Sequence, residues 1–144
     1  MIKHIENCTF DQELPFHVQQ LAHHVENVLE RPIAADAINI VGTSPSKTEI
    51  QVYGWKSPIA PHADNTGLIF FMPILMRSEQ DTLVYGDQEI ELQLGHLYLM
   101  DDRNPHSTIG QGNVIALFLG PFKNGHINDE LIERVSTKFL DYLS

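Results

Sequence analysis

The middle of the sequence is a succession of short segments rich in β-branched and aromatic residues, divided by glycine, proline, asparagine and aspartate. This spacing restricts the chain to folds that assemble many short strands, either a β-sandwich or a jelly-roll barrel. The predicted strands are Ala37–Val41, Lys47–Gly54, Gly67–Met76, Thr82–Tyr85, Gln88–Leu94, His96–Asp101 and Asn113–Gly120.

The polarity of these segments predicts which strands are covered on both faces. Gln88–Leu94 alternates polar and apolar residues after the two-residue turn Gly86–Asp87, as expected of a hairpin strand with one wet face. Leu68–Met76 and Val114–Leu119 are apolar at nearly every position, which favours a sheet that packs beneath helices. Pro73 cannot donate a ladder hydrogen bond, so it predicts a bulge or an edge in its strand.

A helix is predicted on either side of the strand-rich region. Between about Pro15 and Glu30 apolar residues recur every three to four positions, and the proline at position 32 ends the pattern. The same spacing runs from about Asp129 to Leu143, with Asn128 as its N-cap. Without a repeat or a linker in between, we expect one domain over residues 1–144.

Net charge narrows the range of partners. The 144 residues include 19 acidic and 9 basic side chains, which gives a formal net charge of −10. A field of that sign repels nucleic-acid phosphates and anionic lipid headgroups. Neither a nucleic acid nor a membrane surface is therefore expected as a partner.

The remaining features of composition predict a soluble, cytoplasmic protein. The N-terminal residues lack the apolar core of a signal peptide, and the apolar run Leu68–Met76 is far shorter than the ~20 residues of a membrane-spanning helix. Cys8 is the only cysteine, so no intrachain disulfide can form. We expect Cys8 to be a small buried residue, because no redox motif surrounds it.

Three residues could form a metal site. His62 and Asp64 are two positions apart, so in an extended segment their side chains point the same way and can chelate one ion. His106 would supply the third ligand from a distant strand. Two imidazoles and one carboxylate form the facial triad of non-haem iron(II) sites, which leaves positions open for a co-substrate and dioxygen.

The pattern of a histidine and an aspartate two residues apart is common by chance. On its own it is more often a surface histidine beside a loop carboxylate. The segments around these residues strengthen the metal-site interpretation. Tyr53–Gly54 followed by Ile59–Asp64 resembles the start of the first core strand in the double-stranded β-helix iron(II)/2-oxoglutarate oxygenases. Asn104–Ser107 is similar to the segment in which that family places its second histidine.

Two further stretches extend this resemblance. Asp81–Asp101 is similar to the central hairpin of the family, and Asn113–Gly120 resembles the core strand that follows. Together the matching parts cover about residues 47–121. The resemblance implies a mostly β fold, a double-stranded β-helix (jelly-roll) core with an N-terminal and a C-terminal helix. It also implies an iron(II) cofactor, 2-oxoglutarate as co-substrate, and hydroxylation of a small molecule or an exposed side chain.

The expected anchor for 2-oxoglutarate departs from the family pattern. The family usually carries a basic residue on the strand after the distal histidine, and Asn113–Leu119 has none. The resemblance makes Arg77 the best-placed substitute and Arg103 the second, with Tyr53 as a hydrogen-bond donor to the co-substrate carboxylate. The alternatives are a solvated turn arginine and a tyrosine that only packs in the barrel.

Two other function classes stay open at this level. One is a cupin-type metalloprotein that uses no 2-oxoacid, although cupin motifs prefer two histidines and a downstream glutamate. The other is a non-catalytic binding module on the same scaffold.

Asp101 and Asp102 are candidates to orient His106 through hydrogen bonds.

Overall fold

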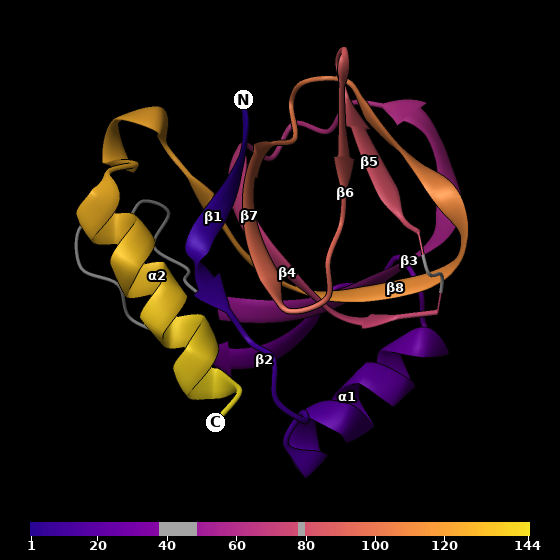
Figure 1. Cartoon of the computed structure of the whole chain (residues 1–144), viewed down its shortest axis with the longest axis vertical. Coiled ribbons are helices and arrows are strands. Elements are labelled where there is room, and N and C mark those ends of the chain that lie inside the picture. The colour runs from indigo at the N-terminus through magenta and orange to yellow at the C-terminus, as the bar shows by residue number, and fades with distance from the viewer. Residues whose placement is uncertain (38–48, 78–79) are drawn as a thin grey trace.

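The computed structural model describes residues 1–37, 49–77 and 80–144 (Figure 1). Its strands are β1 (Ile2–Thr9), β2 (Ile33–Ala37), β3 (Glu49–His62), β4 (Leu68–Met76), β5 (Thr82–Tyr85), β6 (Gln88–Glu91), β7 (His96–Asp101) and β8 (His106–Phe122). Its helices are α1 (Phe16–Glu26), the short 3-10 helix η1 (Asn124–His126) and α2 (Asp129–Tyr142).

All described strands belong to one antiparallel sheet of eight strands that curls on itself. The main order is β1-β7-β4-β8-β3-β2, and the β5–β6 hairpin joins through pairing of β5 with β8. Figure 1 shows the two helices outside the curl, with α2 beside β1 and α1 below β3 and β8. The prediction of a mostly β jelly roll with a helix near each end is therefore confirmed.

Alternating side chains divide the interior into two apolar cores. Phe70 and Leu117 lie on the outer face of the sheet, in the cluster that also contains the buried residues of both helices. Phe71 and Ala116, one position away, lie in the second cluster inside the curl. Successive residues of a strand point to opposite faces, so β4 and β8 must be apolar throughout, as their sequences are.

The helices begin close to the predicted residues. In α2, Asn128 caps the first turn by accepting a 2.8 Å hydrogen bond from the backbone of Leu131. In α1 the helix ends at Glu26, short of the predicted Glu30, which has a left-handed backbone (φ +65°). Among the described residues no helix has both the length and the apolar character needed to cross a membrane.

The strand predictions differ from the structure at several strands. β1 was not predicted, because this edge strand buries only Ile5 and Cys8 and, apart from Ile2, is otherwise polar. β2 precedes the predicted strand Ala37–Val41, most of which lies outside the described residues. β3 and β8 both extend to the candidate metal ligands, beyond the predicted Lys47–Gly54 and Asn113–Gly120, whereas β6 ends at Glu91, short of the predicted Leu94.

Three local predictions are confirmed. The pairing of β4 with β8 shifts register between Pro73 and Leu75, which is the bulge expected at that proline. Gly86 turns the β5–β6 hairpin with a φ of +61°. Cys8 is fully buried, and burial raises the pKa of its thiol.

Candidate metal centre

The two candidate histidines meet because their strands pair there. His62 is the last residue of β3 and His106 the first of β8, and the antiparallel register places them directly opposite each other. Side chains at such positions lie roughly 5 Å apart at Cβ. Their imidazole rings are 4.4 Å apart between centroids, so two residues distant in sequence form one cluster.

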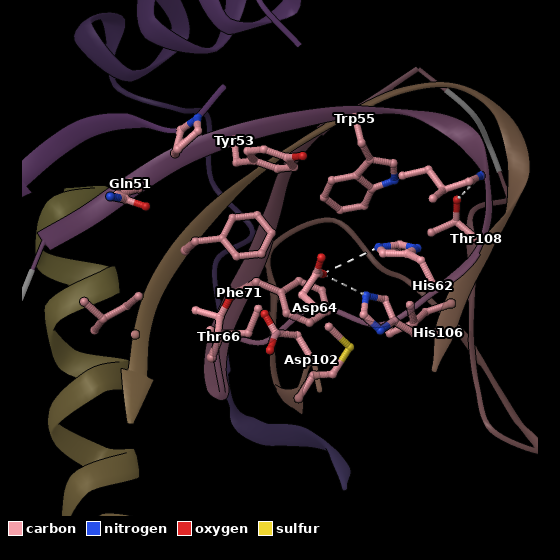
Figure 2. A pocket seen from close by; sticks show the side chains of 18 of the residues that line it. Gln51, Tyr53, Trp55, His62, Asp64, Thr66, Phe71, Asp102, His106 and Thr108 are labelled. Atoms are coloured by element: carbon pink, nitrogen blue, oxygen red, sulfur yellow. Dashed lines mark hydrogen bonds and ion pairs between the residues drawn. The ribbon is translucent and has the colours of Figure 1, made fainter. Parts of the chain in front are cut away.

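Asp64 completes the cluster from the loop after β3. Its Oδ2 lies 3.5 Å from Nε2 of His62 and 3.5 Å from Nε2 of His106 (Figure 2). One potential ligand atom from each of the three residues lies within 4.8 Å of the others. Atoms that share an ion at about 2.1 Å stand roughly 3–3.5 Å apart, so small side-chain shifts suffice for a common ion.

Hydrogen bonds fix the imidazoles in the tautomer that binds metal. Nδ1 of His62 lies 3.0 Å from the carbonyl oxygen of Ala60, and Nδ1 of His106 lies 2.8 Å from that of Asn104. A carbonyl only accepts, so each Nδ1 carries the proton and each Nε2 keeps its lone pair. The donor set of two imidazoles and a carboxylate fits a divalent metal such as iron(II).

The loop that carries Asp64 is tied to Asp102. The backbone N–H of Asp64 donates to the carbonyl of Asp102 at 2.8 Å. Gly67 and Asp102 exchange two more hydrogen bonds, one of them from the Gly67 N–H to Oδ1 of Asp102 at 2.8 Å. These bonds hold the carboxylate of Asp64 beside the histidines without consuming its oxygens.

A pocket of about 360 Å³ opens beside the three ligands, inside the curl of the sheet. It is lined by both histidines, by Asp64 and Asp102, and by side chains of the inner core. The apolar part of this lining comprises Pro32, Tyr53, Trp55, Ile59, Ile69, Phe71, Leu83, Leu92, Met100, Phe118 and Leu119. The arrangement combines a metal-binding group with a largely apolar chamber for a small molecule.

Sequence analysis missed part of the aromatic wall of this pocket. Phe71 and Phe118 read as ordinary core residues, because periodicity shows that a position is buried but not that a cavity borders it. Trp55 could be read from sequence either as a residue at the mouth of the barrel or as one packed under a helix, and it lines the pocket. Tyr53, predicted to contact a co-substrate, does line the pocket. Burial first, and the negative charges of Glu30 and Asp64 second, raise the pKa of its phenol.

The two predicted anchor arginines lie elsewhere. Arg77 donates two 2.8 Å hydrogen bonds to Glu26 of α1, and these lower the pKa of that carboxyl. Arg103 donates from Nε and Nη2 to the two carboxylate oxygens of Asp101 and likewise lowers its pKa. Neither arginine is among the described residues that line the pocket.

The expected partners of His106 also differ. Asp101 is engaged by Arg103, and Asp102 accepts from Gly67, so the carbonyl of Asn104 orients the imidazole instead. A carbonyl two residues before the histidine is a purely backbone feature. No residue type in the sequence signals it.

The carboxyl group of Asp81 is a buried polar group close to the pocket. Asp81 is fully buried, and its Oδ1 accepts a 3.0 Å hydrogen bond from the hydroxyl of Ser57. The Ser57 hydroxyl is also 3.0 Å from that of Thr108, a pocket residue that accepts from the backbone of Ile59. Burial raises the pKa of Asp81, and its Oδ2 has no described partner.

Fold and site together define a jelly-roll protein with a candidate mononuclear metal centre. No protein-family model matches the sequence, and no curated protein matches it. Among solved structures it is similar to a cupin-2 domain containing protein from Shewanella frigidimarina, with 14% identity and a TM-score of 0.48 over 65% of this chain and 81% of that one.

Two other solved structures show a comparable similarity. Protein NMB1881 from Neisseria meningitidis has 9% identity and a TM-score of 0.49 over 74% of this chain and 99% of that one. A cupin superfamily protein from Desulfitobacterium hafniense has 14% identity and a TM-score of 0.46 over 80% and 96%. At such values the similarity assigns neither a family nor a function to this chain.

Proposed function

We propose that this chain is a mononuclear non-haem iron(II) oxygenase that acts on a small molecule held in the pocket. The observation that carries the proposal is the convergence of two Nε2 lone pairs and one carboxylate at the wall of an apolar chamber. Three protein ligands on one face of an ion leave the opposite face open to the chamber.

Each residue has a distinct part in this function. His62, Asp64 and His106 would hold the metal, and the carboxylate would neutralise part of its charge. The apolar wall would exclude bulk water and orient the substrate. When bound, iron(II) would supply the activation of dioxygen, for which protein side chains have no equivalent chemistry.

The geometry favours a form of this function that does not use 2-oxoglutarate. A 2-oxoacid with a second carboxylate needs a cation at the far end of the pocket. Arg77 and Arg103 are each held by two hydrogen bonds to a carboxylate outside it. Recruiting either one to the pocket would first require its charge-assisted pair to break.

Anaerobic titration calorimetry with iron(II) tests the metal centre. We expect one equivalent to bind to the wild type, and His62→Ala, Asp64→Ala and His106→Ala each to weaken binding by about 100-fold or more. His24→Ala, on the exposed face of α1, is the matched control and should bind like the wild type. Equal affinity in all four variants would remove the basis of the proposal.

Titration of the iron-loaded protein with 2-oxoglutarate separates the two forms of oxygenase. We expect no binding at millimolar 2-oxoglutarate and no succinate release above a no-enzyme control in air with ascorbate. Succinate release that disappears in Arg77→Ala would establish the form implied by the sequence resemblance. Protein that binds no iron at all would instead favour a non-catalytic binding module.

A further inference from the structure

Four aromatic rings from three strands line the pocket beside the candidate metal centre. Phe118 lies at the middle of this group, with ring centroids 5.6 Å from Tyr53, 6.3 Å from Trp55 and 5.6 Å from Phe71. The first two contacts are edge-to-face and the third is stacked, so the rings face in different directions. Phe71 also stacks on Tyr98, with centroids 5.3 Å apart, so the aromatic wall offers a ligand chiefly Tyr53, Trp55 and Phe118.

Asp102 adds an unpaired negative group to the same pocket. Its side chain belongs to a residue only 5% exposed, and Oδ1 accepts the hydrogen bond from Gly67. Oδ2 has no hydrogen-bond or ion-pair partner among the described residues, and the carboxylate points into the pocket near Thr66 (Figure 2). The nearest basic residue in sequence, Arg103, donates its hydrogen bonds to Asp101, and the charge of Asp102 acts on it only through space.

Oδ2 of Asp102 is not one of the buried side-chain atoms that lack a partner, so it is open to a group bound in the pocket. A second carboxylate, that of Asp64, lies in the same lining, and no lysine or arginine occurs among the described lining residues. The field of Asp64 reaches the wall, where it contributes to the raised pKa of Tyr53 after burial and Glu30. The pocket is therefore electronegative as well as aromatic.

We propose that this pocket binds a small organic cation, with the cationic group against the aromatic wall and the carboxylate of Asp102. Aromatic faces attract cations through their quadrupole, most strongly where water is excluded, and a buried carboxylate adds direct charge pairing. A volume of about 360 Å³ suits a small molecule.

This inference names the substrate class of the proposed oxygenase and in that sense rests on it. A ligand with a cation at one end and an oxygen, nitrogen or sulfur donor at the other could reach Asp102 and the triad together, since both line one pocket. An ammonium, quaternary ammonium or sulfonium group satisfies the same chemistry. The contacts of the cation itself do not require the metal.

Trp55 is the only tryptophan in the chain, so its fluorescence reports directly on this pocket. Metal-free protein in chelator is titrated with choline and, separately, with 3,3-dimethyl-1-butanol, a neutral molecule of nearly the same shape. We expect choline to bind at least tenfold more tightly. Equal or tighter binding of the neutral alcohol, or no response to either probe, overturns the proposal.

Variants identify the groups responsible. Asp102→Asn keeps an oxygen that can accept from Gly67 and removes the charge, so we expect it to weaken choline binding at least tenfold. Asp87→Asn removes the same charge at an exposed turn, outside the pocket lining, and should leave the affinity unchanged. Equal losses in both would reduce the effect to overall charge and contradict the assignment.

If Asp102→Asn does not fold, Phe118→Leu provides an independent test of the proposal. It keeps an apolar side chain and removes the central ring, and we expect a loss of choline affinity that exceeds any loss for the neutral alcohol. Losses of the same size would contradict a cation–π contact. All of these titrations run without metal, so failure of iron binding and failure of cation binding are separate results.

Discussion

At the scale of single residues, polar groups in this interior are positioned mostly by the backbone. Both imidazoles of the candidate metal centre bond through Nδ1 to a carbonyl two residues earlier, and Asp102 is held by Gly67. The exception is Asp81, whose side-chain partner among the described residues is the hydroxyl of Ser57. Its second oxygen is buried without a described partner, so the ionised form of Asp81 is disfavoured.

We therefore expect Asp81→Asn to change how stability depends on pH. Burial raises the pKa of Asp81 in the native state above that of the unfolded chain. The protonated carboxyl stabilises the native state fully below the unfolded pKa, and this contribution is lost as pH rises through the native pKa. Asparagine does not titrate in this range.

The direction of this pH dependence is tested by comparing the melting temperatures of wild type and Asp81→Asn from pH 4 to pH 7.5. The wild type should lose stability relative to the variant as pH rises, and at neutral pH the variant should equal or exceed it. Asp87→Asn, at an exposed turn, is the matched control. A wild-type advantage that grows with pH would show that Asp81 is stabilised as a carboxylate.

At the scale of elements, the edge strand β1 is joined to β7 through two histidines. Nε2 of His4 lies 2.9 Å from Nδ1 of His96, and the two rings are stacked with centroids 5.1 Å apart. One nitrogen of this pair must be unprotonated for the bond to form. Burial first and the neighbouring His4 second lower the pKa of His96.

The sign of this shift predicts that acid weakens the attachment of β1. Because the folded pKa of His96 is below the unfolded value of about 6.5, its contribution to stability is complete above that value and declines as pH falls toward the folded pKa. The melting temperature of the wild type should drop more between pH 7.5 and pH 5 than that of His96→Gln. The exposed His24→Gln should behave like the wild type.

Two glycines at turns test the packing between elements. Gly95 has a φ of +78°, and a Cβ there would lie 1.9 Å from the carbonyl oxygen of Phe10. Gly86 has a φ of +61°, but a Cβ there would meet no atom within 4 Å. We expect Gly86→Ala to cost about 1 kcal/mol of unfolding free energy and Gly95→Ala about 3 kcal/mol or more.

Urea denaturation of both variants measures these costs. The backbone conformations are similar, so the difference between the variants isolates the clash with Phe10. Equal costs would show that the loop before β7 moves aside freely. That result would also show that the 2.8 Å hydrogen bond from the Phe10 N–H to the Gly95 carbonyl does not hold this loop in place.

How far sequence predicts these elements depends on how local their causes are. β5 and β7 begin and end as predicted, since turn residues bound them on both sides. β3 and β8 run further than predicted because their long pairing absorbs two register shifts before it reaches His62 and His106. The register between two distant strands depends on both of them and cannot be predicted from the sequence of either strand alone.

In the candidate site too, features with local causes were predictable from sequence and tertiary contacts were not. Residue types and spacing predicted the pair His62 and Asp64, the family resemblance supported His106 as the third ligand, and the structure places the three potential ligand atoms together. Arg77 was favoured by its position after that pair, yet it bonds to Glu26 of α1. That contact is a tertiary one with no local signature.

At the scale of the whole molecule, the candidate metal centre brings together parts of the fold that are far apart in sequence. His62 ends β3, Asp64 lies in the loop toward β4, and His106 begins β8. The unfolded chain would bring these three ligands together only rarely. A metal ion that binds them in the native state alone must therefore stabilise the entire fold by mass action.

Thermal unfolding under anaerobic conditions measures this stabilisation. At free iron(II) 100-fold above the dissociation constant, the native state should gain about 2.7 kcal/mol, a rise in melting temperature of roughly 10 °C for a chain of this size. Alanine at His62, Asp64 or His106 should remove most of the rise. Asp102→Asn should retain most of it, because the backbone carbonyl of Asp102, not its side chain, holds Asp64. An equal rise in all four variants would place the iron elsewhere on the molecule, whereas a loss in Asp102→Asn matching that of the triad variants would make Asp102 a ligand.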